Sequence, residues 1–413
     1  MSDTHADIPG PGEPIALIPA VTPSLEDLAR TPGVLRHLRR LTSSFAHDSA
    51  PVSYVYIYTR RPGQRHGEGL HDLAPPLHAF LAQDSGVEGI ACVDDVARAV
   101  VLALQVHQLT NSASARALAC DWLRFVRYMQ RPDDHRLLNF ILDDTGARNE
   151  DGQTSYPGGE PWTVRALHAY ATAWRVLRDE DALGRFWRTI LPATGQLSYT
   201  ARYALAVMDL YETRPDQGLR RWIEDMCAQI IGSGPGYFRA ACGQDEVPLY
   251  DYGQLHAVAR AALLLPDHHD AYITACEATV DRLIEPVIRG GFYHVFPTER
   301  DHQSVFDVSS LAQGLEALYL VTGKDRHRDL ALECCAWLDG NNPAGAPVYD
   351  PQTGRCHDNI NLKGEIAPTT GAESAIEAGL LQLVRCRLEG SRIGLEIDPD
   401  DPGKRGEDYE ARR

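Results

Sequence analysis

Two adjacent carboxylates at the start of an apolar helical segment are the residues of this chain best suited to chemistry. Asp94 and Asp95 are followed by Arg98, and valines and alanines continue the segment at helical spacing. Neighbouring carboxylates repel each other and lose hydration beside an aliphatic helix, which raises the pKa of one of them and suits general acid or base catalysis. A helix cap that pairs with Arg98 explains the same residues without catalysis, so both interpretations stay open.

Two further carboxylates stand at the start of other apolar segments. Asp251 lies between two tyrosines, and Glu373 follows a Gly-Ala pair near the end of the chain. If these helices are parallel neighbours in one bundle, their starts meet at the same end. We therefore predict that Asp94, Asp95, Asp251 and Glu373 converge as the catalytic group, although a helix cap also accounts for Asp251 alone.

Aromatic and charged residues recur beside these helix starts in a pattern that suits sugar binding. Trp162 and Arg165 lie three residues apart on one helix face, next to Glu160. An indole stacks on the C–H face of a sugar ring while charged groups contact its hydroxyls, although ordinary packing and a surface ion pair fit equally well. The predicted substrate-binding residues are Arg98, Glu160, Trp162, Arg165, Tyr199, Arg202, Tyr252, His256, Tyr293, His294, Asp307, Asn341, Asn342, Tyr349, Asp358 and Asn359.

Several of these residues have simpler interpretations. The last long loop, residues 339–370, is of a length that tends to be functional, but Asx turns that fold the loop on itself also explain its many Asn and Asp residues. A histidine on an apolar helix face, such as His256, is more often a core residue than a catalyst.

The elements that position these residues follow a repeating pattern of paired helices. Connections within a pair are short, whereas those between pairs run through residues 131–160, 232–250, 290–305 and 339–370, so the long loops must gather at one end of the bundle. We predict an all-α fold, an (α/α)6 barrel of six helical hairpins with short β segments in the rim loops, one of them in Gly290–Phe296. First helices are expected near Val93, Pro161, Tyr199, Asp251, Phe306 and Gly371, and their partners at Ser112–Gln130, Asp181–Ile190, Gln217–Ile231, His268–Ile288, Asp325–Leu338 and Ser24–Phe45.

Composition limits the classes of function. With 413 residues, of which 44% are hydrophobic, the chain can form one large domain over residues 21–390, between a flexible segment at 1–20 and a charged tail at 391–413. A formal charge of −17 argues against binding to nucleic acid or an anionic membrane. No apolar run is long enough to span a membrane and no signal peptide is apparent, so a cytoplasmic location is expected. Nine scattered cysteines predict reduced thiols, and no spacing indicates a metal site or a cofactor.

Three segments resemble a known group of proteins. Residues 93–99 (VDDVARA), 348–354 (VYDPQTG) and 371–374 (GAES) look like motifs of a bacterial domain often found beside glycosyltransferases, within the six-hairpin glycosidase-like superfamily. The similarity spans roughly Leu35 to Leu383. The chain departs from the pattern at Val96, where an Asn is expected, and at residues 366–370, which lack the Asn-rich approach to the last motif. These departures remove possible sugar contacts, so the resemblance implies a fold and a broad class of activity without a substrate.

The resemblance and the carboxylates together favour a carbohydrate-active enzyme, most simply a glycoside hydrolase acting on an intracellular oligosaccharide or glycoside. One of Asp94 and Asp95 is expected to be the general acid or base, with Glu373 or Asp251 as its partner. The expected partner molecule is a small carbohydrate, and the sequence does not indicate an oligomeric state.

Three alternatives remain. A sugar epimerase or uronate lyase on the same scaffold would use His256, Tyr252 or His294 to remove a proton. A non-catalytic glycan-binding or biosynthetic partner protein would keep the aromatic residues while its carboxylates only cap helices. A helical-barrel natural-product cyclase would line its mouth with aromatics around one acid.

Overall fold

The computed structural model describes residues 25–60 and 86–391, apart from 192–194, 235, 242–246, 248, 293, 296–297 and 300–301, together with positions 23, 78–79, 82 and 395. The predicted N-terminal segment at 1–20 and nearly all of the predicted tail at 391–413 lie outside the described residues.

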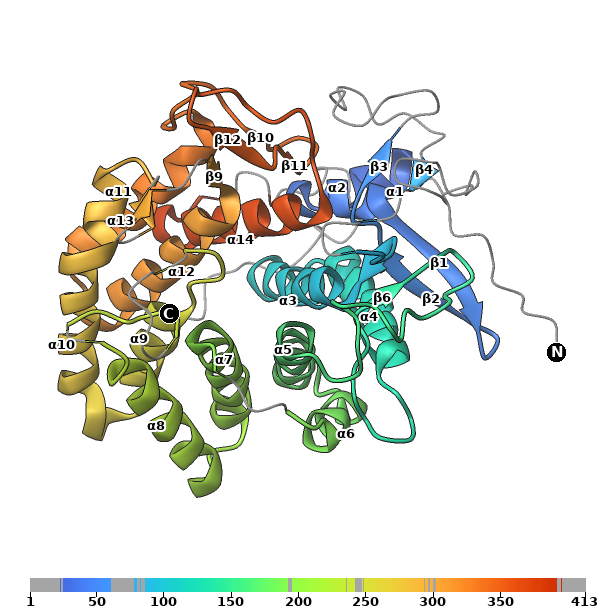
Figure 1. Ribbon diagram of the computed structural model, residues 1–413, viewed down its shortest axis with the longest axis horizontal. Helices are drawn as coiled ribbons and strands as arrows, with labels where there is room; N and C mark the ends of the chain where they lie inside the picture. Colours follow the sequence, from blue (N-terminus) through green and yellow to red (C-terminus); the bar gives the residue numbers. More distant parts are fainter. Residues whose placement is uncertain are drawn as a thin grey trace, which may run out of the picture.

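Six helices form a closed inner ring. Each one packs against the next, and the last contacts the first, so the ring has no open edge (Figure 1). Their side chains are buried on almost every face, as expected for helices enclosed by a second layer. The inner helices are α3 (Val93–Thr110), α5 (Glu160–Leu177), α7 (Leu197–Thr213), α9 (Gln254–Leu264), α12 (Val305–Thr322) and α14 (Ala372–Glu389).

A second layer of helices surrounds this ring, each packed on the inner helix of its own pair. These outer helices are amphipathic and bury one face. They are α4 (Ala113–Met129), α6 (Glu180–Arg188), α8 (Gln217–Ile231), α10 (His269–Thr279), α13 (Asp325–Ala336) and α2 (Gly33–Leu41), which packs on α14. The predicted all-α (α/α)6 architecture is confirmed, and the inner helices begin within three residues of the predicted positions.

The sixth outer helix differs from the prediction. The expected helix Ser24–Phe45 is divided into α1 (Leu25–Ala29) and α2, because Pro32 holds an extended backbone between them. Phe45 is not helical: it lies in strand β1 (Thr42–His47), which pairs antiparallel with β2 (Ala50–Val55). Serine and β-branched residues from Thr42 onward favour the strand over a continued helix.

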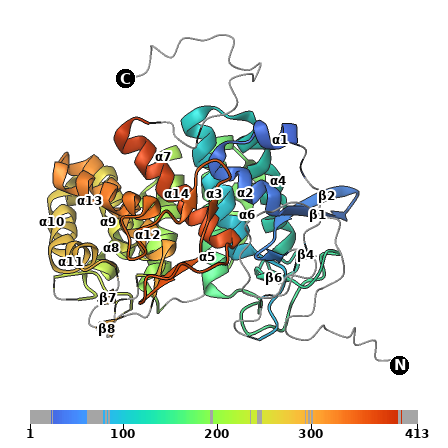
Figure 2. The ribbon, with the colours of Figure 1, turned by 90° about the horizontal axis from the view of Figure 1, so that it is seen from above.

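Short strands decorate the loops, as predicted. The pairs are β3 (Thr59–Arg60) with β4 (His78–Ala79), β5 (Ala91–Cys92) with β6 (Phe140–Ile141), β7 (His294–Val295) with β8 (Thr298–Glu299), β9 (His302–Ser304) with β12 (Asn359–Asn361), and β10 (Tyr349–Asp350) with β11 (Arg355–Cys356). Figure 2 shows β4, β6, β7 and β8 at one end of the barrel. We call this end, where the inner helices begin, the rim.

The remaining short helices continue outer elements. They are η1 (Pro266–His268), η2 (Val280–Ile284) and α11 (Glu285–Arg289), which flank and extend α10, and η3 (Trp337–Asp339) after α13. No helix of the described residues has the length and hydropathy of a membrane span.

Candidate active site

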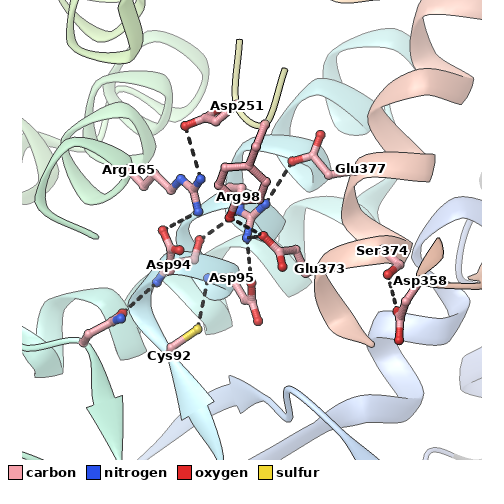
Figure 3. A network of polar contacts seen from close by, with 12 residues as sticks. Cys92, Asp94, Asp95, Arg98, Arg165, Asp251, Asp358, Glu373, Ser374 and Glu377 are labelled. Carbon is pink, nitrogen blue, oxygen red and sulfur yellow. Dashed lines mark hydrogen bonds and ion pairs between the residues drawn. The ribbon is translucent and has the colours of Figure 1, made fainter. Parts of the chain in front are cut away.

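One buried guanidinium, that of Arg98 on α3, gathers three carboxylates near the rim. Its Nη2 donates to Asp95 Oδ1 at 2.8 Å and to Glu373 Oε1 at 2.6 Å, and its Nη1 donates to Glu377 Oε1 at 3.1 Å. Asp95 and Glu373 therefore share one nitrogen although 278 positions separate them in the sequence. Figure 3 shows Arg98 at the centre of this group, between α3 and α14.

A second guanidinium, that of Arg165 on α5, joins two more carboxylates to the group. Its Nη1 lies 2.5 Å from Asp94 Oδ1, and its Nη2 donates to Asp251 Oδ2 at 3.2 Å. Arg202 on α7 binds the other oxygen of Asp251. Two inner helices, α5 and α7, and the loop before α9 thus meet at Asp251, whose own backbone has a positive φ of 52°.

The balance of charge in this carboxylate layer favours protonation of some of its acids. Five carboxylates, those of Asp94, Asp95, Asp251, Glu373 and Glu377, face the three guanidiniums of Arg98, Arg165 and Arg202. Burial raises the pKa of Asp95, and burial raises the pKa of Glu373 to about 7 against the opposing effect of Arg98. Burial also opposes ionisation of Asp251, but Arg202 and Arg165 outweigh it and hold that pKa at about 2. The layer therefore combines proton-holding and ionised carboxyls.

Local contacts fix the start of α3. The sulfur of Cys92, the cap residue, accepts a hydrogen bond from the Asp95 backbone nitrogen at 3.4 Å, and Asn139 Oδ1 accepts one from the Asp94 nitrogen at 3.2 Å. Asn139 comes from the loop beside β6, so a neighbouring hairpin orients the acid pair.

The start of α14 is held in a similar way. Asp358 Oδ1 accepts hydrogen bonds from the Gly371 nitrogen at 2.8 Å and from the Ser374 hydroxyl. Tyr250 Oη donates to Glu373 Oε1 at 2.8 Å. Glu373 is therefore positioned from both sides, by the cap of its helix and by a phenol from the loop before α9.

Glu373 also faces a cavity of about 230 Å³ at the rim, which we call the rim pocket. Its lining includes Tyr250, His302, Phe306, Asp358 and Asn359. The Glu373 side chain is 30% exposed and that of Asp94 is 21% exposed, whereas Asp95 and Asp251 are nearly closed off. Of the four predicted catalytic acids, Glu373 and Asp94 are the more exposed, and Glu373 also lines the rim pocket.

Two predicted aromatic binding residues are buried instead. Trp162 is 3% exposed, its Nε1 donates to the Leu137 carbonyl at 2.9 Å, and Tyr156 packs against its ring. Tyr252 is fully buried and donates to the Phe238 carbonyl at 2.7 Å. The prediction that these rings stack on a sugar is wrong, because both faces are covered and both polar atoms are bonded within the protein.

Three further predicted binding residues organise the backbone. Asp307 is fully buried and forms a capping box with Ser304 at the start of α12. Asn342 donates to the Trp337 and Ala346 carbonyls, which folds its loop as an Asx turn does. Tyr349 is 7% exposed in the packing of β10. Asp307 and Tyr349 are closed to a substrate, and half-buried Asn342 is bonded within its own loop, so the structural interpretation applies to them.

The remaining predicted residues lie in different places. Tyr199 lies beside the carboxylate layer, where burial raises its pKa to about 12, and Glu160 is half-buried at the first residue of α5. Asn341 is exposed in the loop after η3. His256 does not face the rim; it lines a different cavity inside the barrel. Tyr293 lies outside the described residues, and His294 is described only as part of β7.

The sequence analysis missed some residues of the site. Glu377 was detectable, because it follows Glu373 by one helical turn and must share its face. Tyr250 was noticed only as a neighbour of Asp251. Asn139 and His302 carry no local signal, since each reaches the site through the pairing of distant loop segments.

Solved structures share this barrel. A sugar epimerase from a ruminal bacterium aligns with a TM-score of 0.59 at 9% identity, over 74% of this chain and 91% of the other. A family 76 glycoside hydrolase from a bovine Bacteroides thetaiotaomicron strain aligns with a TM-score of 0.54 at 12% identity, over 90% and 78%. An inactive α-1,6-mannanase variant from Salegentibacter sp. HEL1_6, with two consecutive aspartates changed to asparagine and α-1,6-mannotriose bound, gives 0.54 at 11%, over 75% and 93%.

These likenesses show that the chain has the six-hairpin fold of such enzymes. No protein-family model matches the sequence, and no curated protein matches it.

Proposed function

We propose that this protein is a carbohydrate-active enzyme that hydrolyses a glycosidic bond by paired-carboxylate catalysis. The observation that carries this proposal is Glu373, a carboxyl group with a pKa near 7 that opens into the rim pocket and shares Arg98 with a second acid. A carboxyl with such a pKa is partly protonated at neutral pH, as a general acid must be.

The roles divide according to exposure and charge. Glu373 protonates the glycosidic oxygen as the bond to the anomeric carbon breaks. Asp94, paired with Arg165 and 21% exposed, acts as the carboxylate that activates water or attacks the anomeric carbon. Asp251 and Asp95 are positioning residues, since each is closed off and holds a guanidinium that in turn orients a reacting carboxyl.

Similar proteins support this proposal at the level of chemistry. The mannanase variant that is inactive has two consecutive aspartates exchanged, and Asp94 and Asp95 are consecutive aspartates at the start of an inner helix. We further propose that the chain is a relative of the domain found beside glycosyltransferases, on the motifs at 93–99, 348–354 and 371–374. The expected cytoplasmic location stays a prediction.

The test is a product assay with purified protein on a panel of oligosaccharides and glycosides, read by mass spectrometry. Glu373→Gln keeps the size and hydrogen bonding of the side chain but cannot donate a proton, and we expect turnover to fall by roughly 10²–10⁴-fold. Asp94→Asn should have a comparable effect. Glu150→Gln is the matched control, because Glu150 is an exposed rim carboxylate, and it should leave turnover unchanged.

The products decide the reaction. Fragments that gain the mass of one water establish hydrolysis, whereas an unsaturated product establishes a lyase and an unchanged mass with altered retention an epimerase. Full turnover in both Glu373→Gln and Asp94→Asn would exclude paired-carboxylate catalysis.

A further inference from the structure

A second, larger cavity occupies the other half of the barrel interior, and we call it the lumen cavity. Its volume is about 470 Å³, within the range of roughly 300–1,000 Å³ typical of small-molecule sites. Every inner helix contributes to its wall. The wall holds six arginines and four acids, and its neutral polar residues include His168, His256 and Gln105.

The lumen cavity opens at the end of the barrel opposite the rim. Leu109, Leu263 and Leu320 belong to its lining and lie in the last turns of α3, α9 and α12. Their exposures are 38%, 57% and 64%, so they stand at an entrance from solvent. A molecule can therefore enter without passing the carboxylate layer.

The wall carboxylates farther from the rim, Asp209 and Glu316, already form ion pairs with arginines. Asp209, which is 1% exposed, lies 3.1 Å from Arg175 Nε and 2.6 Å from Arg260 Nη2. Glu316 binds Arg387 through two hydrogen bonds of 2.5 and 2.6 Å. These charges compensate one another and leave little for an ionic ligand to neutralise.

Neutral groups, in contrast, lack partners. The ring nitrogens of His168 and His256 form no hydrogen bond with the described residues, and both rings line the cavity. The same holds, within the described part of the chain, for the side-chain amide of Gln105. His168 is 8% exposed and His256 is half-buried. Burial lowers the pKa of His168 to about 3 and that of His256 well below its usual value, so both rings are neutral and each offers one donor and one acceptor.

The wall of the lumen cavity has more arginines than acids, but the direction of the inner helices argues against an anion-binding site there. All six inner helices end at the lumen cavity, and the carbonyls of a helix C-terminus carry a partial negative charge. Arg175 and Arg387 lie in the last turns of α5 and α14, where they balance that charge. The unpaired neutral donors and acceptors, beside the methyl groups of Leu320 and its neighbours, match a ligand that combines hydroxyl groups with C–H faces.

We propose that the lumen cavity is a second ligand site, which binds a neutral mono- or disaccharide independently of the rim pocket. The guanidiniums of Arg98 and Arg165 form the boundary between the two sites, because they line the lumen cavity and bind the carboxylates above it. The ligand contacts His168, His256 and Gln105. The inference does not depend on the proposed reaction, since it concerns binding alone.

The test is a titration of protein containing isotope-labelled histidine, followed by NMR of the imidazole signals. D-Glucose, D-mannose and cellobiose are the probes, and the His168→Gln and His256→Gln variants assign the two signals. We expect at least one probe to shift both signals saturably. Glu373→Gln, which alters the rim pocket, should bind the probe with unchanged affinity.

A pair of leucine variants locates the binding. Leu320→Trp fills the entrance of the lumen cavity and should weaken binding by roughly tenfold or more. Leu362→Trp is the matched control, because Leu362 is 61% exposed but lies in a rim loop, and it should leave binding unchanged. The proposal is overturned if none of the three probes shifts the signals, or if Leu320→Trp binds as tightly as wild type. It is also overturned if Leu320→Trp abolishes turnover together with binding, because the cavity would then be the substrate site.

Discussion

The rim and the opposite end of the barrel are built from the same six helices but differ in chemistry. At the rim five carboxylates face three guanidiniums, and two of the acids have raised pKa values. In the lumen cavity the wall holds six arginines and four acids, and three of these arginines and one acid are shared with the carboxylate layer. The unshared carboxylates Asp209 and Glu316 are paired with arginines. The comparison teaches that helix direction alone does not set reactivity. A helix N-terminus favours an ionised acid, yet burial raises the pKa of Glu373 to about 7 there.

The largest expected difference between the two ends concerns removal of an arginine. Arg98→Met leaves Asp95, Glu373 and Glu377 without their shared guanidinium and should cost about 3–5 kcal/mol of unfolding free energy. Arg387→Met removes a pair that is 34% exposed on the arginine side, and solvent screening should limit the loss to about 1–2 kcal/mol. Urea denaturation measures both.

Arg98→Lys keeps the charge but not the fork, so it should fall between the wild type and Arg98→Met. If Arg98→Met and Arg387→Met lowered the free energy of unfolding equally, the two ends of the barrel would depend equally on arginines that neutralise buried carboxylates.

The positions of the helices and of the acids at their starts could be predicted from the sequence. Helical periodicity placed α3 at Val93 and α8 at Gln217–Ile231, because an inner or outer helix carries its own pattern. Acids at helix starts were also detectable, since parallel helices bring their starts together. The acids and arginines of the predicted set do meet, while their catalytic roles stay a prediction.

Burial of the aromatics could not be predicted. The local sequence around Trp162 and Glu160 is the same whether the indole packs inside the protein or stacks on a sugar. The hydrogen bond that fixes the buried position is to the Leu137 carbonyl, 25 residues away in the sequence. The hairpin β1–β2 was missed for a related reason, since its partner helix α4 covers it only in the folded barrel. Local patterns therefore identified elements and charges, whereas exposure required tertiary contacts.

The second prediction concerns the pH dependence of stability. Glu373 has a pKa of about 7 in the folded protein against its ordinary value of 4.5, so the folded state holds the proton more tightly. Stability should fall as pH rises from about 4.5 to 7 and level off above that. Between pH 5 and 8 the loss due to Glu373 should be on the order of 1–3 kcal/mol, reduced by its partial exposure.

Glu373→Gln removes this titration, so thermal unfolding at several pH values should give a flatter profile for the variant. An unchanged slope would show that Asp95 or another group carries the proton. Glu316→Gln, at the opposite end, serves as the control, and its profile should keep the wild-type slope in this range.

The smallest effects distinguish packing from participation at the rim itself. Trp162→Phe loses the bond to Leu137 and should lower stability by about 1–2 kcal/mol without changing kcat/KM. Tyr250→Phe loses the hydrogen bond to Glu373, which favours the ionised carboxyl, so the pKa of Glu373 should rise. The descending limb of the pH–rate profile should therefore move toward higher pH, by less than about one pH unit. A raised KM in Trp162→Phe would show that the tryptophan contacts the sugar after all. An unchanged pH–rate profile in Tyr250→Phe would show that the phenol does not affect the pKa of Glu373.

The closure of the ring between α3 and α14 also fixes when the site comes into being. During synthesis Arg98 leaves the ribosome early, whereas Glu373 and Glu377 follow 275 and 279 residues later. Until α14 has been made, the inner ring of the nascent barrel lacks its sixth helix, and Arg98 lacks two of its three carboxylate partners. Such long-range closure makes folding slow and exposes apolar surface on the growing chain. The carboxylate layer is thus completed only when the last inner helix has been made, and a chain that is truncated before α14 lacks it.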